Sequence, residues 1–320
     1  MRKKKLLVTR HFPEDVLVRA RRDYDCNLNE EDVVWPYEEL LNRAKGMDAI
    51  LCSSSNEFTS ETFSALPKSI KIIATFSAGH EHINLAAAKS AGIMITNTPD
   101  AVTNSTADIA IFLLLASARR AREAQELVTE GKWTGWTPTQ LLGIEPRGRR
   151  LGILGMGRIG QAVAQKAKAF GLLIHYHNRK RLHAEKEDGA IFHETIEELL
   201  KVSDFLSIHC QLTPETKKII NHQTIKYLPE KAVIINTSRG GVIDDDSLIQ
   251  AIKSGKVVAA GLDVFDHEPS INKNYLPLKN VFLLPHIGSA TTDCRNAMGF
   301  QALDNIDAFF RGESPKDRLV

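Results

Sequence analysis

Three polar residues with complementary chemistry follow apolar runs in the last third of the chain. Arg239 lies in INTSRGG, Glu268 in LDVFDHEP and His286 in LLPHIGSAT. A planar guanidinium can bind both oxygens of a carboxylate, and an imidazole can donate or accept a proton at a carbonyl or alcohol oxygen. A neighbouring carboxylate stabilises the imidazolium and orients the ring. Taken singly, the three residues also suit a surface ion pair, a turn acid and a loop histidine.

The elements that must position these side chains are short apolar runs typical of buried strands. They alternate with helical segments, which predicts a doubly wound parallel sheet; the runs are Ser203–His209, Ala232–Asn236, Val257–Asp263 and Val281–Leu284. Ligands of such sheets gather beyond the carboxyl ends of the strands. We therefore expect Arg239, Glu268 and His286 to converge at one sheet edge.

A glycine pattern precedes this region in RRLGILGMGRIG. Gly155, Gly157 and Gly160 have the spacing G-x-G-x-x-G, between a predicted strand Leu151–Leu154 and a predicted helix Ile159–Phe170. Such glycines allow a tight turn, close approach of the backbone to a pyrophosphate and close helix–strand packing. The start of the helix offers unpaired N–H groups to the phosphates. The pattern predicts dinucleotide binding; the alternative is a glycine turn in some other βα unit.

The segment after the next predicted strand, Leu172–His177, bears on the choice of cofactor. A fold that prefers NAD usually has Asp or Glu here to bind the ribose 2′-hydroxyl. This chain has Asn178, Arg179, Lys180 and Arg181 instead, with three cations able to bind a 2′-phosphate. We therefore favour NADP over NAD, the alternative being a solvated basic loop.

The first hundred residues predict a smaller α/β unit. Its candidate strands alternate with helical segments such as Pro13–Arg22 and Tyr37–Lys45; the strands are Lys5–Thr9, Ala49–Cys52, Ile70–Thr75 and Ile93–Thr96. The alternation implies a parallel sheet. The segment Phe76–Gly79 follows one strand end, which makes it either a substrate-binding loop or an ordinary βα turn.

Helical segments are expected to connect the two parts of the chain. Periodicity predicts a long helix from Asn104 or Ser105 to about Glu130, with Ser105 and Asp108 approximating a capping box. Trp133 and Trp136 follow in an irregular segment, where they either form a subunit interface or cover their own core. A last helix, at about Thr291–Arg311, is expected to pack back on the first domain.

Size and composition limit the possible classes of protein. A chain of 320 residues exceeds a usual single core. We expect an α/β protein with a substrate-binding domain of residues 1–100 plus 288–320, a dinucleotide-binding domain of residues 101–287 and a cleft between them. The net charge of +2 argues against nucleic-acid binding, and the longest apolar run, Ile109–Ala116, is too short for a bilayer. Four scattered cysteines and no signal-peptide pattern predict a cytoplasmic protein without a metal site.

The combined motifs LGILGMGRIGQ, INTSRGGVID, GLDVFDHEP and LPHIGSAT resemble those of the D-isomer-specific 2-hydroxyacid dehydrogenases. The resemblance extends over nearly the whole chain, including NTPDAVTNSTAD. Within the family it is greatest to glyoxylate/hydroxypyruvate reductases and glycerate dehydrogenases. It implies two Rossmann-like domains, NAD(P)-dependent reduction of small 2-keto acids and a homodimer. The alternatives are a D-lactate or D-3-phosphoglycerate dehydrogenase, or a dinucleotide-sensing corepressor. With no regulatory domain after Arg311, an allosteric serine-pathway enzyme is not expected.

The resemblance also implies roles for particular residues. Arg239 would bind the substrate, His286 would be the acid/base, Glu268 would pair with His286, and Ala78 and Gly79 would offer N–H groups to the carboxylate. The cofactor would be bound by the glycines, Asn178, Arg179, Lys180 and His286. The resemblance adds further cofactor contacts: Thr106, Arg158, Ile159, His209, Pro214, Thr216, Thr237, Asp263 and Gly288. One departure is SAGHEH, where many members have an aromatic–acid pattern, so the roles of His80, Glu81 and His82 are open.

Overall fold

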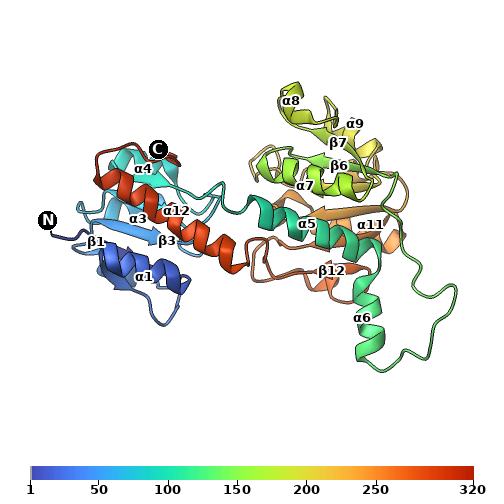
Figure 1. The fold of residues 1–320 in the computed structure, drawn as a ribbon, viewed down its shortest axis with the longest axis horizontal. Coiled ribbons are helices and arrows are strands. Elements are labelled where there is room, and N and C mark those ends of the chain that lie inside the picture. Colours follow the sequence, from blue (N-terminus) through green and yellow to red (C-terminus); the bar gives the residue numbers. More distant parts are fainter. Residues whose placement is uncertain (1) are drawn as a thin grey trace. The chain divides into compact units, whose positions relative to one another are not determined.

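The computed structural model describes residues 2–320, which belong to two compact α/β units (Figure 1). Of the described residues, 2–102 and Ser289–Val320 form unit 1, and Thr103–Gly288 form unit 2. Each unit is built on its own parallel sheet, with helices and a hydrophobic cluster on each face. The predicted fold class, α/β with two doubly wound parallel sheets, is confirmed.

The sheet of unit 1 has five strands in the order β2-β1-β3-β4-β5, all parallel. The central strands are apolar and fully buried, as expected for strands covered on both faces. The bounds are β1 Lys5–Val8, β2 Asp25–Leu28, β3 Ala49–Cys52, β4 Ile72–Thr75 and β5 Met94–Thr96. The edge strand β2 was not predicted, because two of its four residues, DCNL, are polar and they interrupt any apolar run.

Helices cover both faces of this sheet; they are α1 Glu14–Asp23, α2 Tyr37–Ala44, α3 Ser60–Ala65, α4 Leu85–Ala91 and α12 Thr292–Phe310. One face is covered by α1 and α12, the other by α2, α3 and α4. The last helix, α12, packs against β4, β3 and α1, as predicted for the return of the chain to the first domain.

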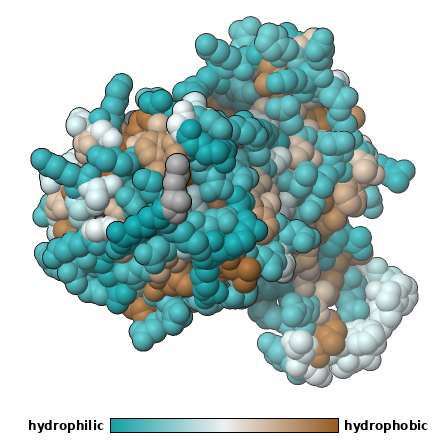
Figure 2. All heavy atoms as spheres, turned by 60° about the vertical axis from the view of Figure 1, so that its left-hand side comes forward, coloured by the Kyte–Doolittle hydropathy of each residue, from teal (hydrophilic) through white to brown (hydrophobic). Residues whose placement is uncertain are grey.

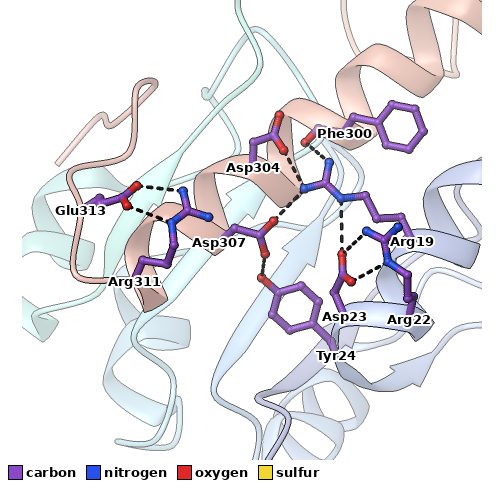
Figure 3. A network of polar contacts seen from close by, with 9 residues as sticks. All are labelled: Arg19, Arg22, Asp23, Tyr24, Phe300, Asp304, Asp307, Arg311 and Glu313. Atoms are coloured by element: carbon purple, nitrogen blue, oxygen red, sulfur yellow. Dashed lines mark hydrogen bonds and ion pairs between the residues drawn. The ribbon is translucent and has the colours of Figure 1, made fainter. Parts of the chain in front are cut away.

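Helix α12 is joined to α1 by a polar network (Figure 3). Arg19 Nη2 lies 2.6 Å from Asp304 Oδ1 and 2.7 Å from Asp307 Oδ2. Arg19 Nη1 also donates to Phe300 O, and the Tyr24 hydroxyl donates to Asp307. The network therefore links residues at opposite ends of the sequence within unit 1.

The sheet of unit 2 has seven parallel strands in the order β12-β11-β10-β9-β6-β7-β8. The strand order reverses between β6 and β9, and such a switch point is where open α/β sheets bind ligands. The bounds are β6 Arg150–Leu154, β7 Leu173–His177, β8 Ile191–Phe192, β9 Phe205–Ile208, β10 Ala232–Asn236, β11 Val257–Leu262 and β12 Val281–Leu283.

Helices again cover both faces: α5 Thr103–Ala118, α6 Ala121–Thr129, α7 Arg158–Ala169, α8 Ala184–Glu187, α9 Ile196–Lys201, α10 His222–Ile225 and α11 Asp245–Ser254. Short 3₁₀ turns, η1 Gly240–Val242 and η2 Lys273–Tyr275, lie between strands. Helices α5 and α7 contribute to one cluster, and α9, α10 and α11 to the other.

The predicted single helix from residue 104 or 105 to 130 is wrong, because the structure has two helices. Arg120 adopts a left-handed conformation with φ 53° and separates α5 from α6. At the break, Ile144 N donates to Ala118 O, so the end of α5 is bonded to a segment that returns from far along the chain. The predicted capping box is also wrong, because α5 begins at Thr103 and Asp108 instead pairs with Lys166 at 2.9 Å.

Between α6 and β6 lies an irregular arm, residues 131–143, visible as pale and brown spheres at the lower right of Figure 2. Trp133 is 57% exposed and Trp136 is 79% exposed. Within residues 2–320, no helix combines the length and apolarity required to traverse a bilayer.

Candidate active site

The glycine loop lies at the switch point of unit 2, between β6 and α7. A Cβ atom at Gly155 would lie 2.6 Å from Cys210 N, and one at Gly160 would lie 2.4 Å from Gly155 O. Both positions therefore require glycine for packing. Beside Gly157, in contrast, a Cβ would meet nothing within 4 Å, and the N-terminus of α7 has no side-chain cap. The open space and uncapped N–H groups fit a pyrophosphate. Arg158 and Ile159, the first residues of α7, lie at this end of the helix.

The segment after β7 lies next to this loop. Asn178 Oδ1 accepts a hydrogen bond from Met156 N at 2.6 Å, which ties the second strand end to the glycine loop. Arg179 and Lys180 are exposed, and no carboxylate occupies the end of β7. Arg181, in contrast, is bound to Glu187 by two hydrogen bonds of 2.8 and 3.0 Å. The expectation of three cations for a 2′-phosphate is therefore corrected to two, because Arg181 is engaged with a buried carboxylate.

On the other side of the switch point, His209 follows β9. Its Nε2 lies 2.8 Å from Ser207 Oγ, and its Nδ1 lies 3.4 Å from Thr237 Oγ1. Loss of solvent around the ring lowers the pKa of His209 to about 4, so the ring is neutral at pH 7. Farther along, the Thr216 hydroxyl donates to Gln211 O at 2.6 Å and Pro214 is exposed, so Thr216 stabilises its own turn.

Arg239 lies in a turn that begins where β10 ends. Asn236 accepts hydrogen bonds from Ser238 N and Ser238 Oγ, and its Nδ2 donates to Arg239 O at 3.0 Å. A Cβ on the next residue, Gly240, would lie 1.8 Å from the carbonyl carbon of Phe265. The glycine thus brings the Arg239 turn against the loop that carries Glu268.

Asp263, directly after β11, holds the loop that carries His286. Its carboxylate accepts hydrogen bonds from Ile287 N at 2.7 Å and Gly288 N at 2.8 Å, and its main-chain oxygen accepts from His286 N at 2.9 Å. Burial raises the pKa of Asp263, an effect that the N–H donors and His286 oppose. A Cβ at Gly288 would lie 3.4 Å from the Thr106 hydroxyl, which places Thr106 beside this loop.

His286 and Glu268 form a direct pair, with His286 Nδ1 2.6 Å from Glu268 Oε2. The other carboxylate oxygen, Oε1, accepts from Phe265 N at 2.9 Å. Burial alone would raise the pKa of Glu268, but these bonds and the charges of His286 and Arg239 hold it below the ordinary value. Glu268 therefore remains ionised and fixes the imidazole. His286 has a left-handed backbone, φ 54°, a strained conformation of the kind found at functional sites.

The structure thus brings Arg239, Glu268 and His286 together in unit 2, with Thr106, Asp263 and Gly288 around the His286 loop. Ala78 and Gly79 lie in unit 1, in the loop that follows β4. Within residues 2–320, no group of three or more His, Cys, Asp or Glu side chains is arranged to hold a metal ion.

Two features of the site were not found from the sequence. Asn236 orders the Arg239 turn; an Asn at a strand end before Thr-Ser is a turn signal that points to this role. Asp263 forms hydrogen bonds with the main chain of residues 286–288, and no local sequence pattern indicates these bonds.

A doubly wound sheet with a glycine loop at its switch point, and an imidazole–carboxylate pair beside an arginine, define an enzyme that uses a dinucleotide cofactor. Residues 111–288 match the model of the D-isomer specific 2-hydroxyacid dehydrogenase NAD binding domain. The chain is 42% identical over 314 residues to glycerate dehydrogenase of Hyphomicrobium methylovorum, covering 98% of both proteins. It is also 42% identical over 318 residues to glyoxylate reductase of Thermococcus litoralis, covering 98% of this chain and 96% of that protein.

Among solved structures, it resembles the NADPH-dependent glyoxylate/hydroxypyruvate reductase of Sinorhizobium meliloti in complex with NADP and malonate. The two are 31% identical with a TM-score of 0.89, covering 99% of this chain and 97% of that one. The chain belongs to the D-isomer specific 2-hydroxyacid dehydrogenase family. The predicted family is confirmed, and the protein is an oxidoreductase with a nicotinamide dinucleotide cofactor.

Proposed function

We propose that this protein reduces glyoxylate and hydroxypyruvate to D-2-hydroxy acids with NADPH, and catalyses the reverse oxidation. The observation that carries the proposal is the 2.6 Å pair of His286 and Glu268 beside the Arg239 turn. It is supported by relatives with about 40% identity that are named glyoxylate reductase and glycerate dehydrogenase. Unit 2 would bind the dinucleotide and supply Arg239 and His286, and the loop after β4 in unit 1 would also bind the substrate.

In this proposal the chain's own groups bind, orient and protonate the keto acid. The reduced nicotinamide, when bound, supplies a hydride to the carbonyl carbon. His286 donates a proton to the carbonyl oxygen, while Glu268 orients the ring and stabilises the imidazolium. Arg239 binds the substrate carboxylate and polarises the carbonyl, and N–H groups of Ala78 and Gly79 bind the carboxylate.

The same proposal assigns the cofactor contacts. Gly155, Gly157, Gly160, Arg158 and Ile159 would bind the pyrophosphate. Arg179 and Lys180, with Asn178, would bind the 2′-phosphate of NADP, because two exposed cations stand where an acidic residue would repel that group. His209, Pro214 and Thr216 would lie along the adenosine, and Thr106, Thr237, Asp263 and Gly288 near the nicotinamide.

Steady-state kinetics test the assignment. We expect glyoxylate and hydroxypyruvate to be reduced with a higher kcat/KM than pyruvate or 3-phosphohydroxypyruvate, and NADPH to be used better than NADH. A preference for pyruvate would indicate a D-lactate dehydrogenase, and a preference for the phosphorylated acid a D-3-phosphoglycerate dehydrogenase. Tight dinucleotide binding without turnover of any keto acid would overturn the enzyme assignment in favour of a sensor.

We also propose a homodimer in which the arm, residues 131–143, contacts a second copy of the chain. Trp133 and Trp136 expose most of their surface, and large aromatic residues are enriched in subunit interfaces. Light scattering of the wild type and of the double variant Trp133→Ser/Trp136→Ser tests this. We expect a dimer for the wild type and a weakened dimer for the variant; a monomeric wild type would contradict the proposal.

A further inference from the structure

The loop that follows β4 in unit 1 has three successive carbonyl groups bound by the protein. Ser77 O accepts from Thr98 N at 2.9 Å, Ala78 O accepts from Asn97 Nδ2 at 2.7 Å, and Gly79 O accepts from Ser77 Oγ at 2.7 Å. Two of these donors are side chains, so the loop is fixed by particular residues as well as by its backbone.

The peptide bonds of this loop are trans. In a trans peptide the C=O and the following N–H point in opposite directions. With the carbonyls directed at their protein partners, the N–H groups of Ala78, Gly79 and His80 point away from those partners. None of the three donates a hydrogen bond within residues 2–320. Main-chain N–H groups without a partner in the protein are donors that an anion can accept from.

The Ser77 hydroxyl is hydrogen-bonded to Thr75, and Thr75 is hydrogen-bonded to His82. Thr75 Oγ1 lies 2.9 Å from Ser77 Oγ and 2.9 Å from His82 Nε2. Thr75 is fully buried. The main chain of His82 is also fixed, because its carbonyl accepts from Phe58 N at 2.8 Å. The imidazole is therefore anchored at its backbone and bonded at its ring.

The number of available hydrogen atoms sets the direction of the three hydrogen bonds that link His82, Thr75, Ser77 and Gly79. A serine or threonine hydroxyl has one hydrogen to donate. Ser77 donates its hydrogen to Gly79 O, so Thr75 must donate to Ser77. Thr75 then has no hydrogen left for His82, so His82 Nε2–H must donate to Thr75. The three bonds can form together only when Nε2 of His82 carries a proton.

We propose that His82, Thr75 and Ser77, together with Asn97, are positioning residues that hold the N–H groups of Ala78, Gly79 and His80 ready for the substrate carboxylate. This inference rests on the proposed function and assigns His82, whose role the sequence left open, a role in substrate binding. His82 acts through Thr75 and Ser77 and does not itself touch the substrate.

Variants at His82 separate a positioning role from general damage. His82→Leu removes the Nε2–H donor, whereas His82→Gln restores an N–H donor at a similar reach. We expect His82→Leu to raise the KM for glyoxylate about tenfold, the effect of losing roughly one hydrogen bond. NADPH affinity should not change, and His82→Gln should return the KM to within about threefold of the wild type. Unchanged KM in His82→Leu, or equal defects in both variants, would overturn the inference.

Ser77→Ala should reproduce the effect of His82→Leu, because it breaks the same chain of bonds. Ser64→Ala is the matched control, because Ser64 also donates to a main-chain carbonyl but lies on the exposed surface of α3. A Ser77→Ala protein with the KM of Ser64→Ala would contradict the proposal.

Two readouts do not depend on turnover. Nitrogen NMR of labelled histidine should show His82 protonated at Nε2; a neutral ring protonated only at Nδ1 would overturn the hydrogen count. Oxalate titrated into the NADPH-bound wild type and His82→Leu should bind the variant about tenfold more weakly. If no keto acid is reduced but oxalate binding shows this difference, the proposed reaction fails while the positioning role stands. Equal oxalate affinity overturns the positioning role alone.

Discussion

At the scale of single residues, the site depends on carboxylates that organise their neighbours. Asp263 is buried and fixes the loop of residues 286–288 through the N–H groups of Ile287 and Gly288. Glu268 then fixes the His286 ring through Nδ1, which leaves Nε2 for the proposed proton transfer to the substrate. The arrangement orients the imidazole from its backbone and from its ring at the same time. An imidazole held in this way would lose little freedom when a substrate binds, which supports the proposed acid/base role of His286.

The first prediction concerns His286. His286→Ala should lower kcat for glyoxylate reduction by about 100-fold or more, the usual contribution of a general acid. NADPH affinity should change little, because the glycine loop and the basic segment after β7 are untouched. Stopped-flow turnover and fluorescence titration with NADPH measure the two quantities. His222→Ala, which alters an exposed histidine at the start of α10, is the control; wild-type rates in His286→Ala would remove this residue from the mechanism.

The three polar residues of this site could be predicted, because each of them follows a strand that is recognisable in the sequence as an apolar run. Arg239, Glu268 and His286 occupy carboxyl ends of neighbouring parallel strands, and topology alone places such ends together. Hydrogen bonds made by particular side chains could not be predicted. The engagement of Arg181 by Glu187 and the chain of bonds from His82 to Gly79 depend on side-chain positions that no periodicity encodes.

At the scale of elements, the end of β7 is where we propose that the protein distinguishes NADPH from NADH. Asn178 Oδ1 already accepts from Met156 N, so Asn178→Asp preserves the acceptor and adds a negative charge. We expect the kcat/KM with NADPH to fall about 10- to 100-fold, because the carboxylate repels the 2′-phosphate. The kcat/KM with NADH should rise, since the carboxylate can bind the ribose 2′-hydroxyl. Steady-state assays with both cofactors measure the change.

Lys186→Asp is the control for that experiment, because it makes a larger charge change on the exposed surface of the nearby helix α8. Its cofactor preference should stay that of the wild type. If Asn178→Asp and Lys186→Asp alter the two constants equally, long-range charge explains the effect and Asn178 does not read the 2′ position.

The segment between β7 and α8 is stabilised by Glu187. Hydrogen bonds from Arg181 and Tyr176 lower the pKa of Glu187 from 4.5 to about 2. Because the folded pKa is depressed, this stabilisation is present above about pH 4.5 and is lost as the pH falls toward 2. Glu187→Gln should lower the free energy of unfolding at pH 7, and the difference from the wild type should shrink as the pH falls from 5 to 3.

Urea unfolding across this pH range measures the difference, with Glu185→Gln as the control, because Glu185 is exposed on the same helix. A gap between wild type and Glu187→Gln that stays constant with pH would show that the ionised carboxylate is not the source of the stability.

Element boundaries show where sequence patterns are insufficient. The strands β6, β9 and β10 coincide with apolar runs in the sequence, and their observed ends lie within two residues of the predicted ends. The division of α5 from α6 was missed, because apolar spacing continues through Arg120 while a long-range bond from Ile144 terminates the first helix. The strand β8 is two residues long, too short for any periodic signal.

At the scale of the whole molecule, the two ends of the chain meet in unit 1. Helix α12 returns after the whole of unit 2 and packs on β3, β4 and α1. Its apolar residues Ala302, Leu303 and Ile306 are buried in the same cluster as Val16 and Leu17 of α1. The apolar residues of α12 indicate that one face of the helix is buried, but they do not indicate which polar residues set its register.

Arg19 provides that register, because it contacts α12 at Phe300, Asp304 and Asp307 (Figure 3). Arg19→Leu should lower the protection of α12 amides against hydrogen exchange by about 2 kcal/mol, as expected for lost hydrogen bonds to charged groups. Arg22→Leu is the matched control three residues along the same helix. Its side chain is 70% exposed and pairs with Asp23 of its own helix, so we expect the protection of the α12 amides to stay that of the wild type. Equal effects of the two substitutions would mean that apolar packing alone holds α12 on α1, and that the contacts of Arg19 with α12 are incidental.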